Sequence, residues 1–248
     1  MERGEPVRFW RNARVMPEGV RPEKVGAEIA GARESLLQGL VFAPDLRTLY
    51  DPISGLQGVA DGTTYDEATD SRVFNGSTDR VDWPSIRNVN GEPITISIWC
   101  YLSATVIHMS PRPFMIAAPP GVNDGLYMFV ARGNGRLVVV DRNDDGASAI
   151  QQATGRTWEN QWVHVLVTYT GSNDPDDMAV AYDGVAQASA AKTEPTGTPR
   201  EKDGLWSIGG SPSADTVNWI GRLAAPMVWR RVLTAAEKYY LFQMTGPR

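Results

Sequence analysis

The stretch from Phe74 to Leu102 decides the fold: it reads FNGSTDRVDW over residues 74–83 and PITISIWCYL over residues 93–102. In the second part, apolar and polar residues alternate with a period of two, which predicts an extended strand rather than a helix. The side chains expected on one face are Ile94, Ile96 and Ile98, and those expected on the other are Thr95, Ser97 and Trp99. Upstream, Asn75-Gly76-Ser77 is typical of a turn between two short strands.

Length, composition and net charge limit the classes of protein to which the chain can belong. The chain has 248 residues, 42% of them apolar, a length and content that suit a single domain with one sizeable core. A net charge of −5 argues against a nucleic-acid binder, which would normally be basic. No apolar run reaches about 18 residues, so we expect no membrane span. The charged start lacks the apolar region of a signal peptide. The single cysteine, Cys100, allows no internal disulfide, which suits synthesis in a reducing cytoplasm.

Short apolar runs recur along the rest of the chain, and each is bounded by Gly, Pro, Asn or Asp. They predict strands at Leu40–Phe42, Phe114–Ala117, Leu126–Ala131, Leu137–Asp141, Trp162–Tyr169, Met178–Tyr182, Val185–Ala190, Leu205–Gly209 and Asn218–Trp229. Hairpin turns are expected at residues 132–135 and at the Asp-Gly pair of residues 182–185. Many short strands without interleaved helices predict an all-β, two-sheet antiparallel jelly-roll sandwich over residues 37–248.

The two ends of the chain differ from this pattern. Residues 1–36 are expected to form an N-terminal extended arm plus a short helix. The arm has apolar residues without strand or helix periodicity, and the candidates for docking onto a partner are Phe9, Trp10, Val15 and Met16. Folding back on their own domain is the alternative for these residues. At the other end, Thr234 and Glu237 form a capping-box pattern that predicts a short helix to about Phe242.

Several segments, taken in order, resemble the laminin-G-like domains of the concanavalin A-like lectin/glucanase superfamily. They are FNGSTDRV (74–81), ITISIW (94–99), WVHVLVTY (162–169), YDG (182–184) and WRRVLTAAE (229–237). The resemblance runs from about residue 39 to residue 243 and implies a concanavalin A-like sandwich. The pair Ala224-Ala225 stands where the family pattern has an acidic pair. Because this fold is shared by lectins, hydrolases and structural domains, the resemblance does not identify a function.

The sequence gives little support for a catalytic site. The β-glucanases of this fold are associated with an E-x-D-x-x-E strand, and retaining hydrolysis needs two carboxylates about 5 Å apart. Glu201-Lys202-Asp203 starts such a pattern, but the second Glu is missing. A Cys or Ser nucleophile finds no better support. Cys100 lies in a predicted buried strand, and the sequence has no Gly-x-Ser-x-Gly nucleophile elbow. His164 is interpreted as a structural strand residue. We therefore expect no enzyme.

One loop has ligands at the spacing of a calcium site. Asp141, Asn143 and Asp145 alternate and are followed by Gly146, like the first half of a calcium-binding loop, although Gln152 stands where the closing Glu would be. The alternative is a polar hairpin loop between two strands. No other cofactor is expected, and calcium is the candidate ion. A second acidic loop at residues 173–177 is interpreted as a solvated turn.

Eight tryptophans raise the question of sugar stacking. Trp99, Trp162 and Trp229 fall on predicted strands and are assigned to the core or the inner face. The candidates for carbohydrate binding are the less constrained tryptophans, Trp158, Trp206 and Trp219, which could present a ring to a ligand.

Together these observations predict a non-enzymatic structural protein of a virion, either capsid decoration or tail-associated. Domains that resemble this one are encoded among phage head and tail genes, and a virion protein is made in the host cytoplasm yet works outside it. Its expected partners are other virion proteins and further copies of itself, tied by the N-terminal arm. The alternative is a lectin module that binds a cell-surface glycan. A glycoside hydrolase is the third possibility. No nucleic-acid or membrane partner is expected.

Overall fold

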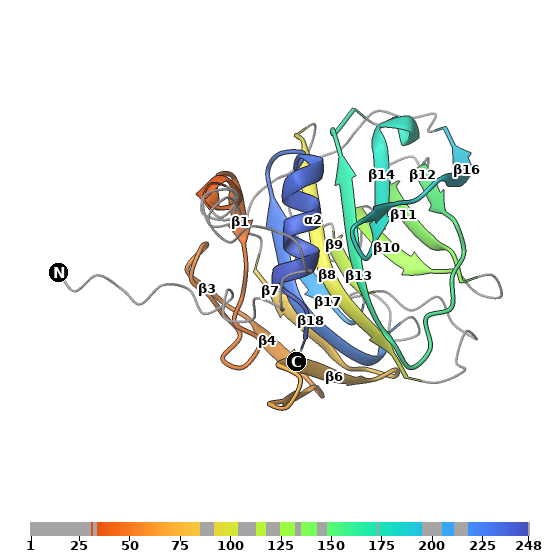
Figure 1. The fold of residues 1–248 in the computed structure, drawn as a ribbon. Coiled ribbons are helices and arrows are strands. Elements are labelled where there is room, and N and C mark those ends of the chain that lie inside the picture. The colour runs from red at the N-terminus through yellow and green to blue at the C-terminus, as the bar shows by residue number, and fades with distance from the viewer. Residues whose placement is uncertain are drawn as a thin grey trace, which may run out of the picture.

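A computed structural model describes residue 31 and residues 34–84, 92–103, 113–117, 125–131, 135–142, 148–172, 174–194, 205–210 and 218–247. Two eight-stranded antiparallel sheets face each other across the core, and a helix lies on the outer face of one of them (Figure 1). The all-β antiparallel sandwich expected from the sequence is confirmed. Among the described helices, none is long and apolar enough to cross a membrane.

Sheet 1 is the sheet that carries the helix. Its strands follow the spatial order β15-β14-β13-β8-β18-β6-β5, and β1 also pairs with β18. The bounds are β1 Leu40–Phe42, β5 Thr64–Asp66, β6 Ser71–Asn75, β8 Ile94–Leu102, β13 Trp162–Tyr169, β14 Met178–Tyr182, β15 Val185–Ala186 and β18 Ile220–Trp229.

Sheet 2 closes the other side of the core, in the order β16-β12-β11-β10-β9-β17-β7-β4. The bounds are β4 Val59–Asp61, β7 Arg80–Trp83, β9 Phe114–Ala117, β10 Gly125–Val130, β11 Leu137–Arg142, β12 Ser148–Ala153, β16 Ser189–Thr193 and β17 Trp206–Ile208. A separate hairpin joins β2, Tyr50–Asp51, to β3, Leu56–Gln57, and a 3-10 turn η2 spans Pro175–Asp177.

Strand β8 has the two faces that its alternation predicts. Ile94, Ile96 and Ile98 lie in the core between the sheets. Thr95, Ser97 and Trp99 point to the other face, where they are also buried. β8 lies at the centre of sheet 1, paired with β13 on one side and β18 on the other. The opposite sheet covers its inner face, and the helix covers Trp99 on its outer face. The expected strand and its orientation are confirmed.

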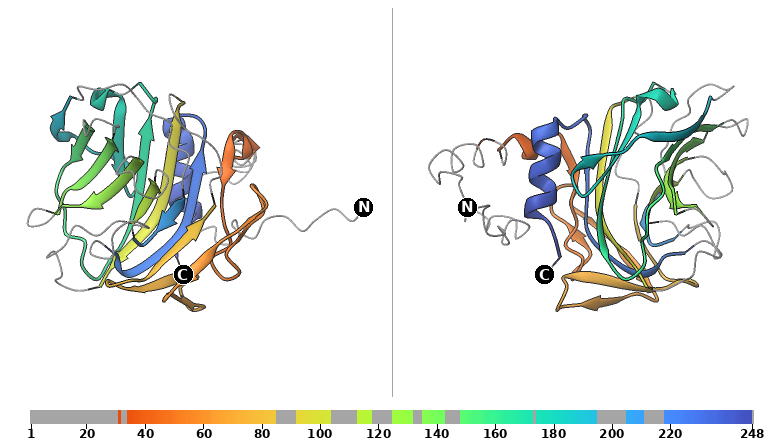
Figure 2. Two further views of the ribbon diagram at one scale, coloured as in Figure 1. Left: turned by 180° about the vertical axis from the view of Figure 1, so that it is seen from behind. Right: turned by 45° about the vertical axis from the view of Figure 1, so that its right-hand side comes forward.

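Helix α2, Ala235–Met244, covers part of the outer face of sheet 1, as the right-hand view of Figure 2 shows. The predicted capping box is present: the Thr234 hydroxyl accepts from the Glu237 amide, and the Glu237 carboxylate accepts from the Thr234 amide. A second apolar cluster forms beneath and beside the helix. Its buried members are Leu36, Ala43, Leu166, Ala181, Met227, Trp229, Leu233 and Leu241.

The end of the N-terminal segment is fastened to the sandwich beside the first turn of α2. The Arg231 guanidinium donates to the carbonyls of Ser35 and Gln38, and it forms an ion pair with Glu237 at 2.6 Å. The Ser35 hydroxyl donates to the same carboxylate, and the Trp229 indole donates to the Leu36 carbonyl. We call these six residues the anchor. Residues 34–37 are helical, which fits the predicted helix, whereas the arm itself, with Phe9, Trp10, Val15 and Met16, lies outside the described residues.

The Asp183-Gly184 hairpin is confirmed, since both residues have positive φ, as a two-residue turn of type I′ requires. The prediction of one strand over Val185–Ala190 is wrong. The chain forms β15 in sheet 1, then crosses to sheet 2 as β16. The amide of Gln187 donates to Val180 in sheet 1, whereas the carbonyl of Ala188 accepts from Thr154 beside sheet 2. The crossing therefore falls between these two residues.

Glu237 joins the anchor to the helix cap, so we predict that Glu237→Gln destabilises the protein. Its carboxylate accepts from Arg231, Ser35 and Thr234, and the Arg231 guanidinium lowers its pKa to about 2. Losing this charge at pH 7 should reduce the free energy of unfolding by about 2 kcal/mol. Urea denaturation measures the change. Glu67→Gln is the control, because the Glu67 side chain is 80% exposed and its ion pair with Arg47 is long, at 3.6 Å. An equal loss in both variants would contradict the assignment.

Candidate functional site

Part of the outer face of sheet 1 lies beyond the reach of α2. The helix covers Trp99 and His164, whose rings contact Phe242. Two residues after Trp99 in β8 and two residues before His164 in β13, Tyr101 pairs with Trp162. Tyr101 also pairs with Arg222 of β18. These three side chains are partly exposed, whereas their neighbours Cys100, Val163 and Leu223 are buried in the core. Strand alternation therefore places two aromatic rings and a guanidinium on an uncovered surface.

The three side chains contact one another across the strands. The ring centroids of Tyr101 and Trp162 lie 5.5 Å apart, with an interplanar angle of 56°. The guanidinium carbon of Arg222 lies 5.4 Å from the centroid of the Tyr101 ring, a cation–π distance. On its other side, Arg222 Nε lies 3.2 Å from Oδ2 of Asp66 in β5. We call Tyr101, Trp162, Arg222 and Asp66 the outer-face platform.

Asp66 is held in place by the turn that follows it. Its carboxylate accepts from the Ala68 amide at 3.1 Å and from the Thr69 hydroxyl at 2.9 Å. The Thr69 hydroxyl, the backbone amides of the turn and Arg222 all lower the pKa of Asp66. The platform therefore combines two ring faces, a cation and a fixed carboxylate. Such a set can bind a molecule that has an apolar face and hydroxyl groups.

The sequence does not predict the platform, because the strand pattern assigns Trp162 to the core or the inner face. That assignment is wrong: Trp162 is half-buried on the outer face. The signal was available in the alternation of β8 and β13, which puts Tyr101 on the face of Trp99 and Trp162 on the face of His164. The extent of the cover provided by α2 could not be read from the strands.

The three tryptophans predicted to bind carbohydrate occupy the core instead. Trp158, Trp206 and Trp219 are 0%, 1% and 0% exposed. The indole of Trp158 donates to the Gly135 carbonyl at 2.6 Å, and that of Trp219 donates to the Tyr101 carbonyl at 3.1 Å. The prediction that these rings present a face to a sugar is wrong, because side chains of both sheets cover them.

Of the three predicted calcium ligands, only Asp141 lies in the described part of the chain. Asp141 is the penultimate residue of β11 and is buried, and its Oδ2 accepts from the Tyr169 hydroxyl at 2.9 Å, which joins the two sheets. Asn143 and Asp145 lie outside the described residues, as does Glu201-Lys202-Asp203. Calcium binding by this loop therefore stays a prediction.

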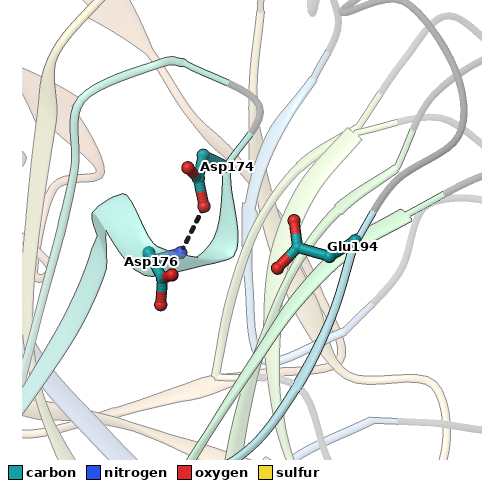
Figure 3. Close-up of side chains that lie close together, drawn as sticks. All are labelled: Asp174, Asp176 and Glu194. Atoms are coloured by element: carbon teal, nitrogen blue, oxygen red, sulfur yellow. Dashed lines mark hydrogen bonds between the residues drawn. The ribbon is translucent and has the colours of Figure 1, made fainter.

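Three other carboxylates lie close enough to share a cation. Asp174 and Asp176 come from the turn η2, and Glu194 follows the end of β16 (Figure 3). One oxygen of each lies within 4.8 Å of the others, and all three residues are exposed. However, Asp174 already caps η2 by accepting from the Asp176 amide, and Lys192 forms an ion pair with Asp176. The ammonium group of Lys192 thus already balances the charge of one of the three carboxylates.

A serine and a histidine meet beneath α2. Ser97 Oγ and His164 Nε2 are 2.8 Å apart, but both residues are 0% exposed. Asp183 accepts from the backbone amide of His164, and within the described part of the chain Nδ1 of the ring has no hydrogen-bond partner. The pair joins β8 to β13 and has no access to a substrate, which agrees with the interpretation of His164 as structural.

The two facing antiparallel sheets define a jelly-roll sandwich. The family model of the concanavalin A-like lectin/glucanases superfamily matches residues 75–237, more than half of the chain. The chain therefore belongs to this superfamily, and the resemblance found in the sequence is confirmed. No curated protein matches the chain.

Solved structures with the same fold include receptor-binding parts of toxins. The binding domain of Paraclostridial Mosquitocidal Protein 1 is 15% identical, with a TM-score of 0.64, over 84% of this chain and 52% of that one. The ligand binding domain of botulinum neurotoxin serotype D, in complex with N-acetylneuraminic acid, is 13% identical, with a TM-score of 0.66, over 87% and 56%. The chain spans about half the length of these structures, and at such low identity the likeness concerns the fold alone.

Burial lowers the pKa of His164 to about 4, and this predicts a loss of stability in mild acid. The unfolded chain has the ordinary value of 6.5, so it binds more protons than the folded chain between pH 6.5 and 4. The free energy of unfolding should therefore fall by about 3 kcal/mol across this window because of His164 alone. Denaturation at several pH values measures the slope.

His164→Gln should flatten the slope between pH 6.5 and 4, whatever its effect on stability at pH 7. His108→Gln removes the other histidine of the chain and serves as the control. An unchanged slope in His164→Gln would show that other groups cause the acid sensitivity.

Proposed function

We propose that this chain is a non-enzymatic, lectin-type module that binds carbohydrate on the outer-face platform. The observation that carries the proposal is the pair of partly exposed rings, Tyr101 and Trp162, beside the ion pair of Arg222 and Asp66. The C–H-rich face of a sugar packs well against aromatic rings, while its hydroxyl groups need donors and acceptors at the edge of the contact. Arg222 supplies donors, and Asp66 supplies acceptors.

The comparisons support recognition of a surface rather than catalysis. Toxin domains that share the fold are described as receptor-binding or ligand-binding, and one of them was solved with N-acetylneuraminic acid. Within this chain, Ser97 and His164 are sealed beneath α2, where they stabilise the packing of the helix on sheet 1. The proposed ligand is a glycan of a cell surface.

A glycan array with the purified chain tests the proposal. Trp162→Ala and Tyr101→Ala should each weaken binding of the best ligand at least tenfold, about 1.4 kcal/mol, because each removes one of the two contacting rings. Tyr239→Ala is the matched control, since Tyr239 is an aromatic residue of α2 that is 57% exposed and outside the platform. Wild-type levels of binding in both platform variants, with unchanged melting temperatures, would reject this site.

We also propose that the module is carried by a virion and attached to it through the N-terminal arm. The anchor supports this second role. Residues that directly follow the arm are fastened to Trp229, Arg231 and Glu237, so an attached arm would hold the whole sandwich. The partners would be other virion proteins and further copies of the chain.

Deleting residues 1–30 tests the attachment and leaves the anchor intact. The truncated chain should fold with a melting temperature close to that of the full chain, but it should no longer sediment with virions from cells that express it. Full co-sedimentation of the truncated chain would show that the arm does not attach the module to the particle.

A further inference from the structure

The inference rests on the proposed function and narrows its ligand. We infer that the outer-face platform selects neutral, hydroxyl-rich sugars over sugars that carry a carboxylate or sulfate group. The observation behind it is that Arg222, the cation of the platform, already faces a fixed carboxylate. Its positive charge is therefore balanced before any ligand arrives.

Asp66 cannot easily leave this position. It belongs to β5, where it pairs with Ser71, and its two carboxylate oxygens accept from Ala68 and Thr69. Turning the carboxylate away from Arg222 would break those hydrogen bonds. Its side chain is 22% exposed and that of Arg222 is 36% exposed, so both reach the surface where a ligand would lie.

An anionic sugar would meet repulsion at this place. Oδ2 of Asp66 lies 3.2 Å from Nε of Arg222, so a charged group that binds Arg222 comes close to Asp66, and like charges at such distances repel. The net charge of −5 for the whole chain also disfavours the approach of anions.

A neutral sugar makes use of both members of the ion pair. Neighbouring hydroxyl groups can donate to Asp66 and accept from Arg222 without any change in the pair, and the C–H face of the ring can pack on Tyr101 and Trp162. Arg222 also stacks over Tyr101, which keeps the guanidinium beside the aromatic surface. The polar and apolar contacts therefore lie next to one another, as in most small-ligand sites.

The test uses a panel of matched neutral and acidic glycans, such as the pair lactose and 3′-sialyllactose. Calorimetric titration of the full chain at fixed ionic strength measures the affinity for each glycan. We expect the neutral member of each bound pair to bind at least fivefold more tightly. Asp66→Asn should narrow this ratio at least threefold, because it removes the repelling charge while its amide oxygen still accepts from Ala68. Glu67→Gln removes a charge from the adjacent residue, whose side chain is 80% exposed, and should leave the ratio unchanged.

The possible results distinguish a failure of this inference from a failure of the proposed function. Equal or tighter binding of the acidic glycans by the wild type, lost in Trp162→Ala, would overturn this inference and leave the proposed function standing. A ratio that Asp66→Asn and Glu67→Gln change equally would also overturn it, because long-range charge would then be the cause. No binding to any glycan of the panel would reject the proposed function, and this inference with it.

Discussion

The outer face of sheet 1 is longer than the helix that covers it, and most features of the surface follow from this mismatch. A helix of ten residues spans about 15 Å, whereas a strand of nine residues spans about 30 Å. Side chains under α2, such as Trp99 and His164, are buried. Side chains of the same strands beyond its last turn, such as Tyr101 and Trp162, are partly exposed. The same period-two pattern therefore produces buried side chains in one place and partly exposed side chains in another.

Much of the fold could be predicted from local patterns. The alternation of Ile94–Leu102, the Asp183-Gly184 turn and the capping box at Thr234 each depend on residues close in sequence, and each is present. The site could not be predicted in the same way. Whether Trp158 or Trp162 is exposed depends on which distant segments cover it, and the indole of Trp158 is satisfied by a carbonyl 23 residues away. Strand crossing between β15 and β16 likewise depends on partners in two different sheets.

Burying polar groups under α2 costs free energy, which the packing of the helix must offset. The neutral His164 ring contacts the Trp99 and Phe242 rings, and Thr245 accepts from the Trp99 indole at 2.9 Å. Such hydrogen bonds fix the helix in one position on the sheet, because a shifted helix would leave buried donors without partners. The limit of the helix cover is thereby fixed as well, and with it the extent of the uncovered surface.

The two ends of α2 differ in what they join. Its first turn is bound to the segment that leads to the N-terminal arm, through Glu237 and Ser35. Its C-cap residue, Thr245, is bonded to Trp99, two residues before Tyr101. The helix thus separates the anchor from the outer-face platform on one side of the molecule, so a partner held at one would leave the other sterically accessible.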